Sequence, residues 1–119
     1  MGIVQPTKEQ MKAFAEMPDE GPIFMINLLK FKADGGRESY QTYGQKFAEI
    51  MMSKGVEIIY HGNAKLTVIG TEDWDEVIVV KYPSRDSFIE MTTNPEYQAA
   101  SKFRTAGIED SRLILTKIA

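Results

Sequence analysis

The apolar pattern is most informative between Trp74 and Arg85, where a strand and the beginning of a helix follow one another almost without a loop. Residues 77–80 are four consecutive apolar residues, mostly β-branched, and this composition favours a strand. Pro83 cannot continue the hydrogen bonds of a sheet, and Ser84 is a good N-cap. The stretch therefore predicts a central strand that runs directly into a helix.

Residues 23–31 predict another strand, because they are apolar at both alternating positions apart from Asn27 and Lys30. A strand with this pattern is usually buried on both faces. The two polar residues are three positions apart and therefore point to opposite faces. We expect one to face a pocket beneath the helices and the other to face a subunit interface or a sheet edge.

Helical spacing and capping signals predict the helices. The capping box Thr7-Lys8-Glu9-Gln10 predicts a short N-terminal helix that ends near Met17. A second helix begins near Glu38 and closes at Lys54-Gly55, with an apolar stripe formed by Tyr40, Tyr43, Phe47, Ile50 and Met51. The helix that starts at Ser84 pauses at Asn94-Pro95, an N-cap followed by proline, and a further helical piece ends at Gly107.

Two more strands complete the pattern. One begins at 56–60, resumes after His61-Gly62-Asn63 and ends at Ile69-Gly70, and the other closes the chain at 111–118. The order strand, helix, strand therefore occurs twice. This is the ferredoxin-like split βαβ plan of the α+β class, with a four-stranded antiparallel sheet and helices on one face. We expect residues 1–119 to form one such domain, with 1–20 as an N-terminal helical extension.

The number of apolar strand positions predicts a homodimer. Helices cover only one face of the sheet, yet residues 23–29 and 77–80 place apolar side chains on both. A twofold copy of the same chain, packed sheet against sheet, is the simplest cover for the second face. The predicted partner is therefore the chain itself, and the predicted assembly is a dimeric α+β barrel.

Composition narrows the function classes. The chain has 119 residues, of which 43% are hydrophobic and 26% charged, and its net charge of −3 gives no overall basic footprint for nucleic acid. Without cysteine, it has no disulfide, thiolate metal site or cysteine nucleophile, which fits a reducing compartment. No signal peptide or membrane-spanning run is apparent. We expect a cytoplasmic protein without membrane or nucleic-acid partners.

Several phrases together resemble the domain-of-unknown-function family 1330 of the dimeric α+β barrel superfamily. They are Asn27-Leu28-Leu29-Lys30-Phe31-Lys32, Gly36-Arg37-Glu38-x-Tyr40-x-x-Tyr43, Trp74-Asp75, Tyr82-Pro83-Ser84-Arg85, Met91 with Pro95-x-Tyr97, Arg104, and Asp110-Ser111. The resemblance covers the chain from about Gly21 onward. It implies a ferredoxin-like subunit whose sheet packs against that of its partner.

The resemblance implies little about chemistry, because that family is not tied to an established reaction. Relatives in the superfamily include cofactor-independent monooxygenases, haem-degrading monooxygenases, chlorite dismutases and muconolactone isomerases. Haem-degrading relatives use an Asn, a Trp and a His, and this chain has Asn27, Trp74 and His61. Their histidine lies on the second helix, whereas His61 is predicted on a strand, so the sequence argues against haem degradation.

His61 is the candidate catalytic residue. It is the only histidine, and an imidazole titrates near neutrality, so it could serve as a general base. The competing interpretation is a histidine at a strand bend that bonds a neighbour or water.

The acidic residues 72, 73, 75 and 76 predict a solvated turn, since they follow no calcium-loop spacing. We therefore predict no metal site and no cofactor.

Candidate substrate-binding residues are the polar and aromatic side chains placed on otherwise apolar elements. Arginine suits a carboxylate through paired hydrogen bonds, while tyrosine combines an apolar ring with a hydroxyl. The set comprises Asn27, Lys30, Arg37, Tyr40, Trp74, Tyr82 and Arg104. For each a structural role is the alternative, such as Lys30 reaching water, Asn27 bonding a loop, or Trp74 plugging the end of a barrel.

Two functional hypotheses follow from this sequence. In the first, the protein is a cofactor-independent enzyme, monooxygenase- or isomerase-like, that acts on a small aromatic or carboxylated molecule. In the second, it is a non-catalytic dimer that binds a metabolite or has a structural role.

Overall fold

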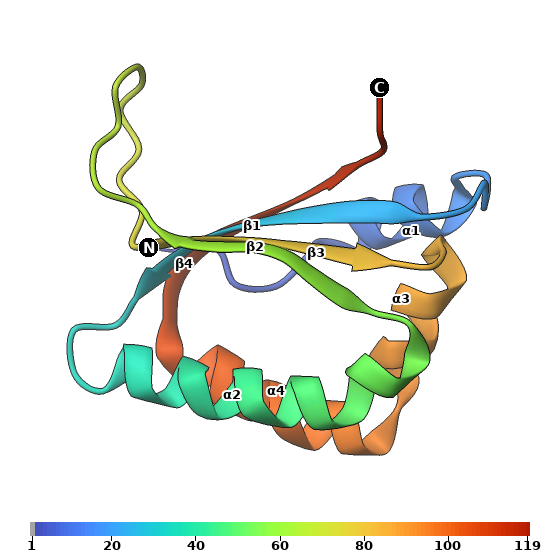
Figure 1. Ribbon diagram of the computed structural model, residues 1–119. Coiled ribbons are helices and arrows are strands. Elements are labelled where there is room, and N and C mark those ends of the chain that lie inside the picture. Colours follow the sequence, from blue (N-terminus) through green and yellow to red (C-terminus); the bar gives the residue numbers. More distant parts are fainter. Residues whose placement is uncertain (1) are drawn as a thin grey trace.

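The computed structural model describes residues 2–119; Met1, with which the predicted N-terminal extension begins, lies outside the described residues. Four strands form one antiparallel sheet in the order β2-β3-β1-β4, and helices cover one of its faces (Figure 1). The elements are α1 (Lys8–Glu16), β1 (Ile23–Phe31), α2 (Gly36–Met51), a 3-10 turn η1 (Met52–Lys54), β2 (Glu57–Asn63), β3 (Glu76–Tyr82), α3 (Arg85–Thr93), α4 (Pro95–Gly107) and β4 (Ile108–Thr116). The predicted ferredoxin-like α+β plan is confirmed.

Capping side chains place the starts of α1, α3 and α4 where the sequence predicts them. The Thr7 hydroxyl accepts from the backbone N–H of Gln10, whose side chain bonds back to Thr7 N–H. The Ser84 hydroxyl accepts from the N–H of Ser87, and Asn94 caps α4 ahead of Pro95. Strand β3 therefore turns into α3 within two residues, as the pattern predicts.

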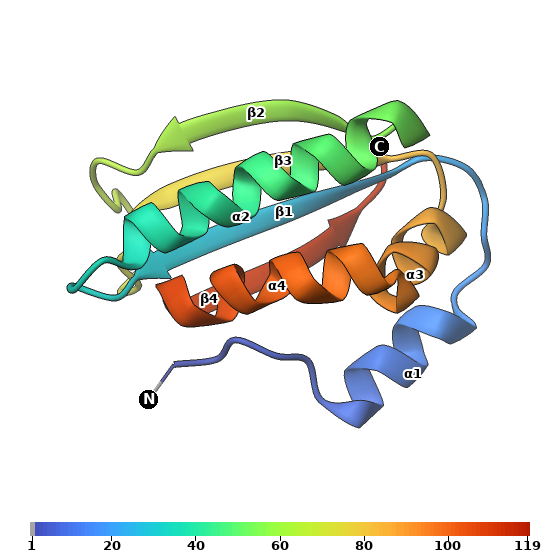
Figure 2. The same cartoon turned by 90° about the horizontal axis from the view of Figure 1, so that it is seen from below.

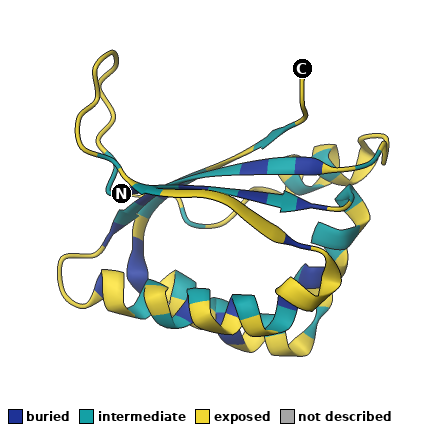
Figure 3. Cartoon of the chain, viewed as in Figure 1, coloured by how far each residue is buried: buried dark blue, intermediate teal, exposed yellow. Residues whose placement is uncertain are grey.

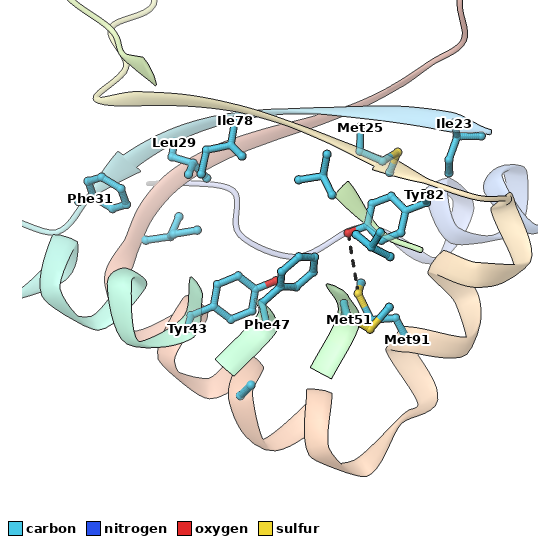
Figure 4. Packing of buried hydrophobic residues seen from close by; sticks show 14 residues of the cluster. Ile23, Met25, Leu29, Phe31, Tyr43, Phe47, Met51, Ile78, Tyr82 and Met91 are labelled. Atoms are coloured by element: carbon cyan, nitrogen blue, oxygen red, sulfur yellow. Dashed lines mark hydrogen bonds between the residues drawn. The ribbon is translucent and has the colours of Figure 1, made fainter. Parts of the chain in front are cut away.

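The core lies between the sheet and the helices, as the close view of its side chains shows (Figure 4). β1 and β3 present alternate residues to it, and Leu29 is fully shielded from solvent. α2 supplies Tyr43, Phe47 and Met51, which belong to the predicted stripe. These side chains hold α2 across the sheet beside α4 (Figure 2).

The opposite face of the sheet, which we call the open face, has no helix over it. Its side chains come from the other alternate positions, so it is mainly apolar in the centre. In Figure 3, buried residues of β1 and β3 are interspersed with residues of intermediate exposure. The open face includes Phe24, Ile26, Leu28, Tyr60, Val77, Val79 and Ile114.

The second strand differs from its prediction. β2 runs without interruption through His61-Gly62 and ends at Asn63, and its bulge lies between Ile58 and Tyr60. Gly62 leaves room for the Tyr60 ring, because a Cβ there would lie 2.3 Å from the Tyr60 hydroxyl oxygen. The strand was expected to resume and end at 69–70, but residues 64–75 instead form a projecting arm beyond the last backbone pair, Ala64 N–H to Asp75 O (2.9 Å).

The N-terminal helix is fastened to the domain mainly by its neighbour α3. The Arg85 guanidinium donates to the backbone oxygens of Ala15 and Met17 at the end of α1. The rings of Phe14 and Phe88 meet edge to face at 5.1 Å. Residues 3–5 continue this attachment along α4 and β4 (Figure 2).

Candidate functional site

A buried carboxylate on the helix side of the sheet is the centre of the candidate site. Glu76 is the first residue of β3 and shares its face with Ile78, Val80 and Tyr82, so its side chain is only 9% exposed. His61 Nε2 lies 2.7 Å from Glu76 Oε1, and Arg37 pairs with Glu76 Oε2. One carboxylate thus joins a histidine to an arginine.

Four elements hold these side chains together. Pairing of β2 with β3 places His61 beside Ile78 and next to Glu76. Arg37 lies in the first turn of α2, and its guanidinium carbon is 4.8 Å from the centroid of the Phe31 ring on β1. The imidazole of His61 remains 54% exposed and the Arg37 side chain 43% exposed, so a ligand can reach both.

The hydrogen bond to Glu76 sets the chemistry available to His61. A carboxylate can only accept, so Nε2 carries the proton in this bond. In the neutral imidazole the basic lone pair is then on Nδ1. Glu76 thus fixes the ring and tautomer of His61, while Arg37 balances the carboxylate charge.

A group of tyrosines occupies the space between the sheet and α2 and α4. Burial raises the pKa of the Tyr40 and Tyr82 hydroxyls, and the positive charge of Arg104 partly opposes the shift at both. Burial also raises the pKa of Tyr43 well above its usual value, and its hydroxyl lies 3.0 Å from that of Tyr97. The hydroxyls of Tyr40, Tyr43 and Tyr82 therefore stay protonated at neutral pH.

The remaining polar candidates on this side are tied into the fold. The amide nitrogen of Asn27 donates to Ile78 O at 3.2 Å, within the sheet. Arg104 donates to Val4 O at 3.0 Å and so holds the N-terminal segment against α4. The same segment approaches Asp110, whose pKa is held below its usual range, chiefly because Ile3 N–H donates to Oδ1 at 2.9 Å.

A cavity of about 470 Å³ opens beside the Arg37 end of the site. It lies where β1 ends and α2 begins, and both Lys30 and Arg37 line it. The full lining is Lys30, Phe31, Lys32, Ala33, Gly36, Arg37, Glu38, Asp75 and Glu109. A second cavity, of about 310 Å³, lies at the far end of α2 and has Met51 and Met91 in its wall.

The structure separates the predicted site residues into two groups. Asn27 shares the helix side of the sheet with Met25 and Leu29, whereas Lys30 lies on the other face, so the predicted opposite orientation is confirmed. Lys30 Nζ lies 3.7 Å from Asp73 Oδ2. The Arg112 guanidinium carbon lies over the Trp74 ring, 5.1 Å from its centroid. On the helix side are Asn27, Arg37, Tyr40, His61, Tyr82 and Arg104.

The expectation of a solvated acidic turn is wrong for two residues. Glu76 is buried because it already has a helix-facing position in β3. Asp75 Oδ2 accepts from Phe31 N–H at 2.8 Å and is thereby bonded to the end of the central strand β1. Strict alternation with Ile78, Val80 and Tyr82 was the signal in the sequence that could have placed Glu76 on the inner face.

Within residues 2–119, no group of three or more His, Asp or Glu side chains is arranged to hold a metal ion. None of the helices in this part of the chain is long and apolar enough to cross a membrane.

Comparison with known proteins places the chain in a family. Residues 23–118 match the family model described as a domain of unknown function, DUF1330. The chain belongs to the DUF1330 family. In this DUF1330 protein, the residues that match the family model include every strand of the sheet and begin after α1.

Solved structures similar to this DUF1330 protein agree with the fold. RPA0582, a protein of unknown function from Rhodopseudomonas palustris, is 36% identical with a TM-score of 0.91, covering 100% of this chain and 98% of that one. A Dabb family protein with a ferredoxin-like fold from Mesorhizobium loti is 12% identical (TM-score 0.61; 84% and 99% covered). A dimeric ferredoxin-like protein of unknown function from Bacteroides fragilis is 19% identical (TM-score 0.54; 85% and 100% covered). No curated protein matches the chain.

Proposed function

We propose that this DUF1330 protein is a cofactor-independent enzyme that transfers a proton on a small carboxylated or aromatic molecule, as an isomerase or the first step of an oxygenation would require. The observation that carries the proposal is the bond between His61 Nε2 and the buried Glu76 carboxylate, backed by Arg37. A histidine oriented by a carboxylate in this way has the geometry of a general base.

The step is a simple proton transfer. His61 Nδ1 takes a proton from a carbon beside a carbonyl group, and the electron pair of the broken C–H bond moves into the enolate. Where a C=C bond is conjugated with this enolate, return of the proton to the far carbon of that bond gives an isomer, with no net change in oxidation state. Arg37 has five N–H donors, so it can pair with Glu76 and still meet a substrate carboxylate in the adjoining cavity.

The active assembly that we propose is a homodimer formed through the open face. The subunit exposes 7733 Å², whereas a compact monomer of 13.4 kDa exposes about 6,500 Å². The excess is of the order of the roughly 800 Å² that each partner contributes to a standard interface. The Bacteroides fragilis protein of similar fold is described as dimeric, which supports a dimer for this chain as well.

The proposal is tested by hydrogen exchange, which needs no knowledge of the product. Carboxylated carbon acids such as 2-oxobutyrate, levulinate and muconolactone are first tested for thermal stabilisation of the protein. Those that bind are then incubated with it in D₂O, and loss of the proton signal of the acidic C–H group is followed by NMR. We expect the wild-type chain to accelerate deuterium exchange at the C–H group. With His61→Ala, the exchange rate should equal that measured without protein.

The controls separate catalysis from binding. Glu57→Ala changes an exposed residue at the far end of the same strand and should exchange at the natural rate. Arg37→Ala should weaken binding of carboxylates. Equal exchange by the natural chain and His61→Ala would refute the catalytic role, and stabilisation without exchange would favour a non-catalytic binding protein.

A further inference from the structure

The arm formed by residues 64–75 is the largest feature that the candidate site does not use. It joins β2 to β3 and rises from the sheet on the side of the open face, away from the helices (Figure 1). Residues 65–73 are all exposed (Figure 3).

The base of the arm is fixed to the open face. Arg112 Nη2 of β4 lies 3.1 Å from Glu72 Oε2, and its guanidinium lies over the Trp74 ring. Lys30 of β1 is 3.7 Å from Asp73. These contacts from two strands set the direction in which the arm projects.

The arm is also held together internally. The Thr67 hydroxyl donates to Glu72 O at 2.6 Å, across the two limbs. Gly70 allows the turn between them, since its φ of +121° is one that side-chain-bearing residues rarely adopt. This bond and the turn restrict the conformations open to the arm, which lowers the entropic cost of binding.

The tip of this arm is apolar although it faces water. Leu66 is 80% exposed, Val68 84% and Ile69 94%, and none of them belongs to the core or packs against it. Such side chains add nothing to the folding of the subunit, but they would stabilise a complex that covered them.

We propose that the arm is a clasp whose tip, Leu66, Val68 and Ile69, packs against the second copy of this chain in the homodimer. The inference rests on the sheet-to-sheet dimer of the proposed function. Arg112 and Lys30 are at once open-face residues and contacts of the arm, so a copy seated on the open face lies directly beside it. Twofold symmetry then lets each arm reach the other subunit.

The overall dimensions favour a second copy as the occupant. The radius of gyration is 14.2 Å, compared with about 13.5 Å expected for a compact chain of this length. The excess exposed area is of the order that one partner contributes to a standard interface.

The first test is the triple variant Leu66→Ser, Val68→Ser, Ile69→Ser, compared with the natural chain by analytical ultracentrifugation over a dilution series. We expect the dimer to dissociate at a concentration at least about tenfold higher, because three aliphatic contacts are lost. The control is Met17→Ser with Met52→Ser, which removes exposed apolar side chains outside the sheet and the arm and should leave dissociation unchanged.

The second test uses the absence of cysteine. A nitroxide attached to Val68→Cys reports mobility at the tip alone, and the same label at Gln45→Cys on α2 is the control. We expect the tip label to be immobile in the dimer and to become mobile on dilution.

The outcomes distinguish the arm from the dimer. If the triple variant dimerises as tightly as the wild-type chain and the label at position 68 is mobile, the clasp is overturned. The dimer itself would then remain supported. If the unchanged chain is a monomer at every concentration, both the clasp and the dimer are overturned. Binding of phosphatidylcholine vesicles that the triple variant loses, without a change in dimerisation, would assign the tip to a lipid surface and also overturn the clasp.

Discussion

His61 Nε2 lies 2.7 Å from Glu76 Oε1, and this bond connects the edge strand β2 to a carboxylate that solvent hardly reaches. The second oxygen of Glu76 pairs with Arg37 at the start of α2. A single buried charge thus links sheet and helix. We expect this charge to contribute both to stability and to the proposed chemistry. Unfolding experiments measure the first contribution without a substrate.

Replacing Glu76 by Gln should destabilise the protein by about 1–3 kcal/mol. Arg37 then loses the negative charge with which it pairs, and the Glu76 position is poorly solvated, so water cannot replace that charge. The amide keeps the shape of the side chain, so packing changes little. Urea unfolding followed by circular dichroism gives the free energy.

The control for that experiment is Glu57→Gln on β2. Glu57 pairs with Lys81 at 3.6 Å, but its side chain is 61% exposed. Exposed pairs contribute at most about 1 kcal/mol, so we expect a smaller loss than at Glu76. Equal losses at the two positions would contradict a special role for the buried carboxylate.

The buried tyrosines predict a loss of stability in alkali. Burial raises the pKa of Tyr40, Tyr43 and Tyr82 in the folded state. Above their ordinary pKa near 10, the unfolded chain releases these protons while the folded chain keeps them, so the unfolding free energy falls as pH rises. Three such groups give a slope of up to about 4 kcal/mol per pH unit.

Urea unfolding between about pH 8 and about pH 11 measures this slope. Tyr43→Phe removes one of the three hydroxyls and should reduce the slope by about 1.4 kcal/mol per pH unit. A slope that is the same in the variant would show that Tyr43 ionises equally in both states.

The sequence predicts most of the fold because local signals and apolar periodicity agree. The strand at Ile23–Phe31 is recovered at both ends, and the caps at Thr7, Ser84 and Asn94 lie where helices begin. Such positions depend on near neighbours in the chain. The arm was missed because Leu66, Val68 and Ile69 have the pattern of a strand but no neighbouring strand to pair with.

The site was predictable only in part. His61 and Arg37 stand out by residue type, yet their meeting at Glu76 depends on the register of β2 against β3 and on the position of α2. A single sequence does not determine these long-range relationships. Asn27 and Arg104 also stand out by type, but the structure shows them bonded to Ile78 and Val4 backbone oxygens.

The contact between Gly36 and Gly107 predicts a severe effect of a single methyl group. A Cβ on Gly107 would lie 2.4 Å from Gly36 O, where the start of α2 meets the end of α4. Backbone cannot yield as a flexible side chain can, so Gly107→Ala should destabilise the protein by about 1–3 kcal/mol in thermal or urea unfolding.

Gly44 provides a matched control, because it lies inside α2 and an added methyl group would have no neighbouring atom within 4 Å. Alanine favours helix there, so Gly44→Ala should stabilise the protein by about 0.5–1 kcal/mol. The same chemical change is thus expected to have opposite signs at two positions. Destabilisation of similar size at both would contradict the backbone contact as the cause.

Val79 provides the sharpest test of the open face as the dimer interface. It lies on the central strand β3, opposite Ile26 on one side and Tyr60 on the other, and points away from the core. Val79→Glu should leave the fold intact but weaken dimerisation at least about 100-fold, because an unpaired carboxylate would be buried between the sheets. Sedimentation should show a monomer, with an unchanged far-ultraviolet circular dichroism spectrum. Gln45→Glu introduces the same charge on α2 and should remain dimeric, and a dimeric Val79→Glu would show that the subunits meet through another surface.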